Sequence, residues 1–196
     1  KLAKAEQLEV PVLDEAGLIE AITASERNVA QRIIEEFMLL ANETVAEHLN
    51  SNQIATLYRV HESPDPLKVA QFKEFISTLG HTLVSRGGIR PKHFQQLVDR
   101  VKGTSEEKPI VFLMLRTMQK ARYDVQSLGH FGLAAEHYTH FTSPIRRYSD
   151  LVVHRVLRRS RHQEVNRSIR EKNFEELSEI AKQVSQRDKR AEEAER

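Results

Sequence analysis

Residues 129–155 hold most of the side chains that could do chemistry. The run at 129–133 (GHFGL) is followed by residues 137–150 (HYTHFTSPIRRYSD) and by the pair His154 and Arg155. The run combines aromatic rings and hydroxyls with two adjacent arginines and a Ser-Pro step, and proline suits the first turn of a helix. The pattern predicts an extended segment that ends at Ser143 and a helix that begins at Pro144.

The predicted helix start would be an anion site. Ser143 is a good N-cap, and the free amides and positive dipole end of the first turn would lie beside Arg146 and Arg147. The rings of Tyr138, Phe141 and Tyr148 could stack on bases or line a narrow channel, which suits a single-stranded nucleic acid.

Other interpretations of these residues stay open. Aromatic rings are more often core than stacking platforms. Ser143 lacks the G-x-S-x-G context of a nucleophile. Histidines at 130, 137, 140 and 154 suggest a metal, but His137 and His140 would face opposite sides of an extended segment. Packing and ion pairing are the alternative for Arg147, Tyr148 and Asp150.

Positive charge is concentrated in the same part of the chain. Residues 145–170 contain eight arginines and two acidic residues, a local charge of +6, whereas the whole chain carries +2. Arginine binds phosphate oxygens two at a time, so a polyanion is the expected partner. A solvated helix face is the alternative.

Composition bounds the class of protein. The 196 residues are 39% hydrophobic and 30% charged, with no cysteine, which excludes disulfides, zinc-thiolate sites, iron–sulfur clusters and cysteine nucleophiles. No run resembles a membrane span or a secretory signal, so we expect a soluble, cytoplasmic protein. The chain begins without Met and stops inside a charged helical pattern, which suggests a fragment.

Periodicity predicts a helix-rich α+β fold. We expect a hairpin at 8–23, a long helix from the N-cap Ser25 to about 49, and a strand at 55–60. Helices are expected from 66 to Gly80, at 92–102, at 106–121 after a capping box at 104–107, from Pro144, and at 171–196. We see no linker or repeat and do not divide the chain.

Residues 140–148 (HFTSPIRRY), followed by Asp150 and by His154 with Arg155, closely resemble the signature of the RNB catalytic domain of the ribonuclease II and ribonuclease R family. Residues 32–38 (RIIEEFM), 41–43 (ANE) and 129–133 are similar to the same family. The resemblance covers essentially the whole chain, and the pattern looks closer to bacterial ribonuclease R.

The resemblance implies a processive 3′→5′ exoribonuclease that releases nucleoside 5′-monophosphates from single-stranded RNA by magnesium-assisted hydrolysis. Arg146 matches the arginine that binds the scissile phosphate, and Glu35 matches a glutamate of the catalytic pocket. RNA contacts are expected from residues of the central run: Ser143, Arg147, Tyr148, Thr142 and Tyr138. Asp188 lies where the family commonly has a glutamate in an Ala-Glu-Arg run, but the local sequence here is RDK. DNA is not expected as a physiological substrate, nor a membrane as a partner.

The family holds magnesium through an Asp-rich run that this chain lacks, so the resemblance implies no metal ligand here and Mg2+ bound upstream. The chain would be the C-terminal half of an RNB domain without its flanking OB-fold domains, and inactive by itself. Two other hypotheses remain: a non-catalytic RNA-binding descendant, or a helical module whose Arg face meets an acidic protein. A solvated carboxylate is the alternative for Glu35.

Overall fold

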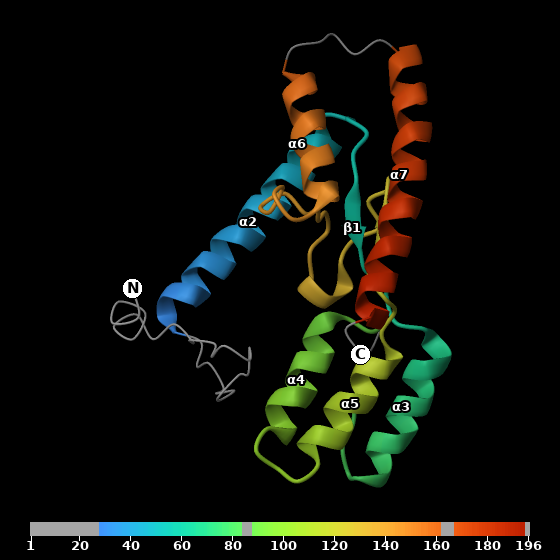
Figure 1. Ribbon diagram of the computed structural model, residues 1–196. Helices are drawn as coiled ribbons and strands as arrows, with labels where there is room; N and C mark the ends of the chain where they lie inside the picture. Colours follow the sequence, from blue (N-terminus) through green and yellow to red (C-terminus); the bar gives the residue numbers. More distant parts are fainter. Residues whose placement is uncertain (1–27, 84–87, 162–166, 195–196) are drawn as a thin grey trace, which may run out of the picture. The chain divides into compact units, whose positions relative to one another are not determined.

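The computed structural model describes residues 28–83, 88–161 and 167–194, with side chains in the last range from residue 174 (Figure 1). Contacts divide the chain into two compact units, Lys1–Glu36 and Phe37–Arg196. The expected hairpin at 8–23 and the expected N-cap Ser25 lie outside the described residues. The helix-rich α+β class is confirmed.

Helix α2 (Val29–Ser51) is closed at both ends by specific hydrogen bonds. Asn28 caps its start: the Gln31 amide donates to Asn28 Oδ1 at 2.8 Å, and the Asn28 amide donates to Gln31 Oε1 at 3.0 Å. At the other end Gln53 is left-handed, with φ 55°. The amides of Gln53 and Ile54 donate to the carbonyls of Asn50 and Leu49, both at 2.9 Å, a Schellman motif.

The described strands form one antiparallel pair, β1 (Tyr58–Val60) and β2 (Arg122–Asp124). Strand β1 is shorter than the predicted 55–60, and Arg59 pairs with Tyr123 at its centre. Beyond β1, the Phe131 amide donates to the His61 carbonyl at 2.7 Å. A Cβ on Gly132 would lie 2.8 Å from His61 Nδ1, so this close approach requires glycine.

Three helices build the first core: α3 (Pro66–Thr78), α4 (Pro91–Val101) and α5 (Glu107–Thr117). Helix α5 contacts both others, and the core residues include Phe72, Phe94 and Ile110 (Figure 1). Asp65 caps α3 by accepting from the Leu67 amide at 2.8 Å.

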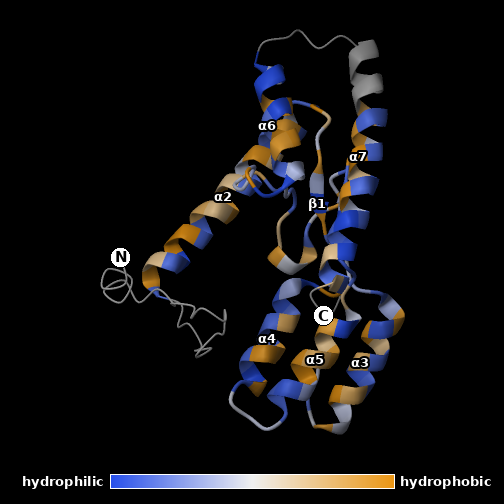
Figure 2. Ribbon diagram, viewed as in Figure 1, coloured by the Kyte–Doolittle hydropathy of each residue, from blue (hydrophilic) through white to orange (hydrophobic). Residues whose placement is uncertain are grey.

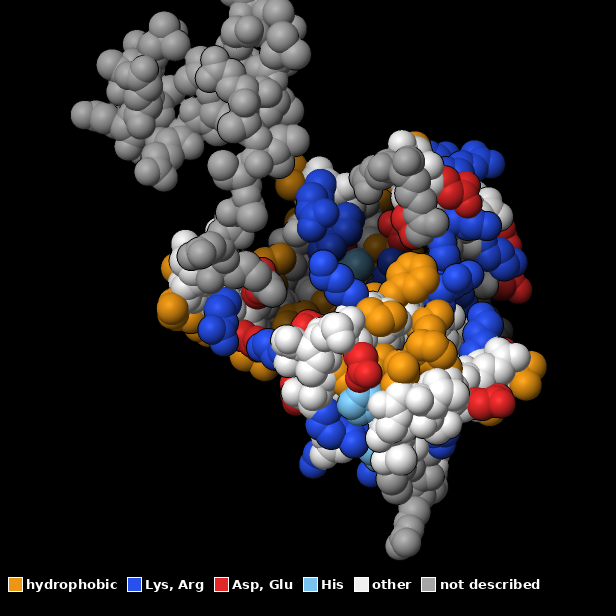
Figure 3. Space-filling model, turned by 90° about the horizontal axis from the view of Figure 1, so that it is seen from below, with side chains coloured by type: hydrophobic (Ala, Val, Ile, Leu, Met, Phe, Trp, Pro, Cys, Tyr) orange, Lys and Arg blue, Asp and Glu red, His pale blue; other side chains and the backbone are white. Residues whose placement is uncertain are grey.

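Two large hydrophobic side chains of α5, Phe112 and Leu115, remain exposed. Figure 3, seen from below, shows hydrophobic side chains gathered beside Lys and Arg.

The predicted capping box at residues 104–107 is wrong. The Thr104 hydroxyl donates to the Val101 carbonyl at 2.7 Å, and Glu107 accepts from the Gly103 amide at 2.6 Å. Both side chains are therefore used to close the turn after α4. Helix α5 also ends at Thr117 rather than 121, because the chain must extend before it pairs as β2 at Arg122.

The second core lies where α6 (Tyr148–Ser160), α7 (Arg167–Ala194) and strand β2 meet. Its buried residues come from five segments: Leu49, Leu57, Tyr123, Val152, Val153, Leu177 and Ala181. Figure 2 shows that α7 is hydrophilic along most of its length, so it contributes a narrow apolar stripe. No described helix is at once long and apolar enough to cross a lipid bilayer.

Candidate nucleic-acid interface

Residues 143–147 form a turn, not the first turn of a helix. The amides of Arg146 and Arg147 donate to the Ser143 carbonyl, at 3.3 and 3.1 Å, and Arg147 is extended, with φ −120° and ψ 121°. Helix α6 begins only at Tyr148. The prediction that the helix begins at Pro144 with Ser143 as N-cap is therefore wrong by four residues.

The turn is held by a buried carboxylate. Asp150 is fully buried and accepts from the Ser143 amide at 2.8 Å and from Arg147 Nε and Nη2 at 2.9 and 2.8 Å. Burial alone would raise the Asp150 pKa, but these hydrogen bonds and the Arg147 charge outweigh it, so the pKa is lowered. Asp150 also stands in the first turn of α6, where the helix dipole favours an anion.

The turn presents three exposed side chains. Ile145 is 99% exposed, Tyr148 is 53% exposed, and Arg146 between them is exposed as well. Arg147 is committed to Asp150, whereas Arg146 makes no side-chain hydrogen bond or ion pair with another described residue. The two neighbouring arginines therefore have different roles: Arg147 fixes the turn, and Arg146 is available to a ligand.

A second cluster lies beside the turn and joins four elements. The Tyr123 hydroxyl lies 2.8 Å from His140 Nδ1 and 3.1 Å from the Ser149 hydroxyl. The Arg59 guanidinium lies 4.7 Å from the centre of the Tyr123 ring and bonds Asp188 at 2.8 Å. Arg59 and Asp188 also line a groove of about 470 Å³, together with Lys120, Arg122 and Lys189.

The segment that leads into the turn is fixed from two sides. Asn42 of α2 donates to the Tyr138 hydroxyl at 3.0 Å and accepts from the Phe141 amide at 2.9 Å. From α6, His154 Nε2 bonds the Phe141 carbonyl at 2.9 Å, and the two rings stack with centroids 4.0 Å apart. Tyr138 is 6% exposed, so its ring packs inside the protein and is not presented to a base.

Two histidines of this region should make the fold sensitive to acid. Burial, followed by nearby positive charge, lowers the pKa of His130 and of His140 from 6.5 to about 4. In this pH range the two histidines bind protons in the unfolded chain but not in the folded one. The free energy of unfolding therefore falls as the pH drops from about 6.5 to about 4. We expect the thermal midpoint to fall over this window, and to fall less steeply in His140→Asn. Equal slopes would contradict the assignment.

The described residues do not fit a magnesium site. No group of three or more histidine or acidic side chains among them could hold a metal ion. The carboxylate nearest the turn, Asp150, already uses both oxygens on Ser143 and Arg147.

A comparison with protein families decides the identity of the fold. The family model described as RNB domain matches residues 2–163. The chain belongs to the RNB domain family. The predicted resemblance is thereby confirmed.

Named relatives of this RNB chain are bacterial ribonucleases. It is 45% identical over 185 residues to Ribonuclease R of Aquifex aeolicus, covering 94% of this chain and 26% of the relative. It is 42% identical to Ribonuclease R 1 of Lactococcus lactis, covering 94% and 23%. The chain therefore spans about a quarter of the length of these relatives.

Solved structures agree with this assignment. RNase R of Mycoplasma genitalium, in complex with ribose methylated single-stranded RNA, superposes with a TM-score of 0.77 at 35% identity, covering 89% of this chain and 28% of that one. Yeast Ssd1, described as a pseudonuclease, gives 0.67 at 27% identity, covering 81% and 20%. The fold of this chain is thus shared by an RNase R and by a protein described as a pseudonuclease.

The structure of this RNB domain brings together Ser143, Arg147 and Asp150, and places Arg146 and Tyr148 at the surface beside them. The Thr142 hydroxyl is buried and makes no hydrogen bond with the described residues. Glu35 is half-buried and belongs to the unit Lys1–Glu36, whereas the turn belongs to the unit Phe37–Arg196.

Sequence reasoning missed Arg59, Tyr123 and Asn42. Arg59 and Tyr123 meet through the pairing of β1 with β2, and Asn42 reaches across 99 positions to Phe141. Arg59 and Tyr123 carry no local motif. Asn42 does stand in the ANE run that resembles the family, which is the one signal that could have identified it.

Proposed function

We propose that this chain is the part of an RNB-family 3′→5′ exoribonuclease that grips the backbone of single-stranded RNA. One observation carries the proposal: the buried Asp150 binds Arg147 and Ser143, so the turn holds Arg146 exposed while its neighbour is neutralised. An arginine on a fixed turn, without an acidic partner among the described residues, suits a phosphate group.

In this proposal Arg146 binds the scissile phosphate through two parallel hydrogen bonds. The same guanidinium would offset the negative charge that grows on the phosphate oxygens in the transition state, and because the turn is already fixed, little reorganisation is needed. Tyr148, half exposed next to it, could stack on a base. Glu35 would bond the terminal nucleotides. Magnesium would be held by carboxylates outside the described residues.

A second candidate function is RNA binding without hydrolysis. The similarity to Ssd1, a pseudonuclease, favours this alternative, because that protein retains the RNB fold. The groove cations Arg59, Lys120 and Arg122 are each paired with a carboxylate, so the exposed Arg146 would remain the phosphate contact in a binder as well.

The test compares this chain with the full-length protein that contains it. We expect the full-length protein with Mg2+ to release nucleoside 5′-monophosphates from a 5′-labelled single-stranded RNA, and the 196-residue chain to release none. Binding without release by the full-length protein would select the non-catalytic alternative. Robust release by the isolated chain would show that no upstream aspartates are needed, and binding by neither protein would contradict both functions.

A further inference from the structure

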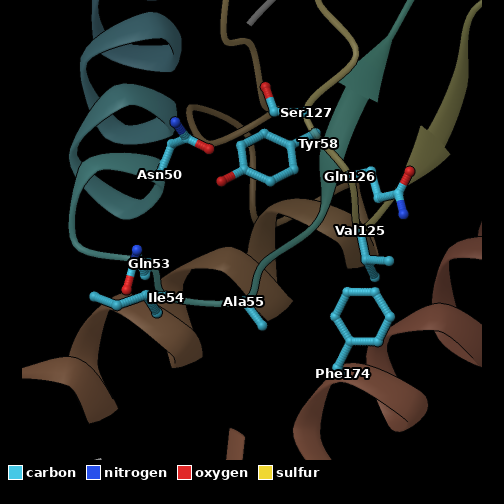
Figure 4. A pocket seen from close by; sticks show the side chains of 9 residues that line it. All are labelled: Asn50, Gln53, Ile54, Ala55, Tyr58, Val125, Gln126, Ser127 and Phe174. Carbon is cyan, nitrogen blue, oxygen red and sulfur yellow. The ribbon is translucent and has the colours of Figure 1, made fainter. Parts of the chain in front are cut away.

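A cavity of about 530 Å³ lies in the unit Phe37–Arg196, lined by residues outside the arginine turn (Figure 4). It lies between the end of α2, strand β1, the chain after β2 and the helix α7. Among the described residues, none of the nine side chains that line it carries a charge, whereas 30% of the chain is charged. A phosphate or a carboxylate would find no ionic partner among these described side chains.

Tyr58 supplies an unused hydroxyl to the cavity. The residue is only 4% exposed, and Figure 4 shows its hydroxyl directed toward Asn50 and Gln53. The hydroxyl makes no hydrogen bond with another described residue. Burial raises the Tyr58 pKa to about 12, so the group stays protonated and can both donate and accept. The hydroxyl oxygen is therefore accessible at the cavity, where a bound molecule can bond it.

His137 orients two more polar groups of the lining. Asn50 Nδ2 lies 3.2 Å from His137 Nε2, and the Ser127 hydroxyl lies 2.7 Å from His137 Nδ1. If the amide donates to Nε2, the proton of the neutral ring is on Nδ1 and is donated to Ser127. The Asn50 carbonyl and the Ser127 hydroxyl proton then remain for a ligand, one as acceptor and one as donor.

Gln53 occupies a backbone position that normally favours glycine. Its φ of 55° lies in the left-handed region, where a side chain costs about 1–2 kcal/mol. The Schellman motif at the end of α2 would form at least as well with glycine. The amide of Gln53 lines the cavity, so the costly side chain adds a donor and an acceptor there.

We propose that this cavity binds a nucleobase, an inference that rests on RNA being the substrate. Amides such as Gln53 and Gln126 pair with base edges, and Asn and Gln suit the donor and acceptor of adenine. Phe174, 41% exposed at the rim, offers a face for stacking. A planar, uncharged heterocycle with donors and acceptors on one edge matches both features.

The base could belong to the RNA strand or to a free nucleotide, and one binding experiment separates these sources. Dissociation constants of the 196-residue chain are measured for an octamer of adenylate, for an abasic octamer with the same phosphates, and for AMP as competitor. We expect the adenylate octamer to bind at least about tenfold more tightly than the abasic one. Competition by AMP that Tyr58→Phe weakens assigns the cavity to free nucleotides, and competition that is absent or unaffected by Tyr58→Phe assigns the cavity to the strand.

Two variants test the cavity itself. Tyr58→Phe removes one hydroxyl and should reduce the preference for bases by about 3- to 10-fold, as expected for one neutral hydrogen bond. Gln53→Gly should reduce it similarly while raising the thermal midpoint, because glycine relieves the left-handed residue. Reduced binding in a more stable protein excludes misfolding as the cause. Gln71→Ala, on the exposed face of α3, is the matched control.

The cavity and the proposed function can fail separately. Arg146→Ala should weaken binding of the adenylate and abasic octamers by the same factor, because it removes a phosphate contact. If Tyr58→Phe and Gln53→Gly leave the preference for bases unchanged, the cavity is not a base site, whatever Arg146→Ala does. If they abolish the preference while Arg146→Ala changes neither octamer binding nor the turnover of the full-length protein, the cavity stands and the phosphate role of Arg146 falls.

Discussion

Asp150→Ala should lower the free energy of unfolding by about 3–5 kcal/mol, as expected when one partner of a buried ion pair is removed. The carboxylate is fully buried, and its loss leaves the Arg147 guanidinium, only 22% exposed, without its partner. The Ser143 amide also loses its acceptor. Urea denaturation measures the loss, with Asp99→Ala on the exposed face of α4 as the control, which should change stability by less than about 0.5 kcal/mol.

A double variant separates the cost of an unpaired charge from the loss of the turn. Arg147→Leu together with Asp150→Ala removes both charges, so it should recover part of the stability lost in Asp150→Ala. The stability that depends on ionised Asp150 is present above the unfolded pKa of about 3.9 and is lost as the pH falls through the lower folded pKa. Asp150→Ala and the double variant should both lack this pH-dependent part of the free energy of unfolding. A loss below about 1 kcal/mol in Asp150→Ala would contradict the role of Asp150 in holding the turn.

Local patterns predicted most of the helices because their signals lie within a few residues. Helix α3 begins at Pro66 as expected, and α4 ends within a residue of its prediction. The start of α6 was predicted wrongly because the deciding contact is not a local propensity. Ser143 and Pro144 favour a helix start, but the Asp150 carboxylate takes the Ser143 amide and Arg147 becomes extended. A buried acid can override a capping preference of about 1 kcal/mol.

The second cluster of the interface could not be predicted, because its members meet only through tertiary contacts. Arg59 and Tyr123 are ordinary strand residues in the sequence, and Asp188 was considered only through the family resemblance. The pairing register of β1 with β2 places the Arg59 guanidinium over the Tyr123 ring. Asp188 of α7 then forms an ion pair with that guanidinium. The cavity beside Tyr58 has the same origin, since its polar groups come from α2, β1 and the chain after β2.

Arg146→Ala in the full-length protein should lower turnover by about 10²- to 10³-fold, the range for loss of one preorganised donor to transition-state charge. RNA affinity should fall far less, because single-strand binding spreads over several phosphates. The slope of log affinity against log salt should change by only about 0.7, the share of one phosphate contact. A large loss in turnover with a small loss in binding would mark Arg146 as acting mainly on the transition state.

Matched variants decide whether geometry or charge matters at this position. Arg146→Lys keeps the charge but not the planar pair of donors, so it should recover binding and leave much of the turnover defect. Arg116→Ala removes an exposed arginine from α5, outside the signature residues, and should keep near-normal turnover. Asp150 holds the backbone that carries Arg146. Asp150→Asn should therefore also lower turnover, as Arg146→Ala does, at a temperature where the protein stays folded. Normal turnover in Arg146→Ala would remove this arginine from the mechanism and leave the turn as a structural element only.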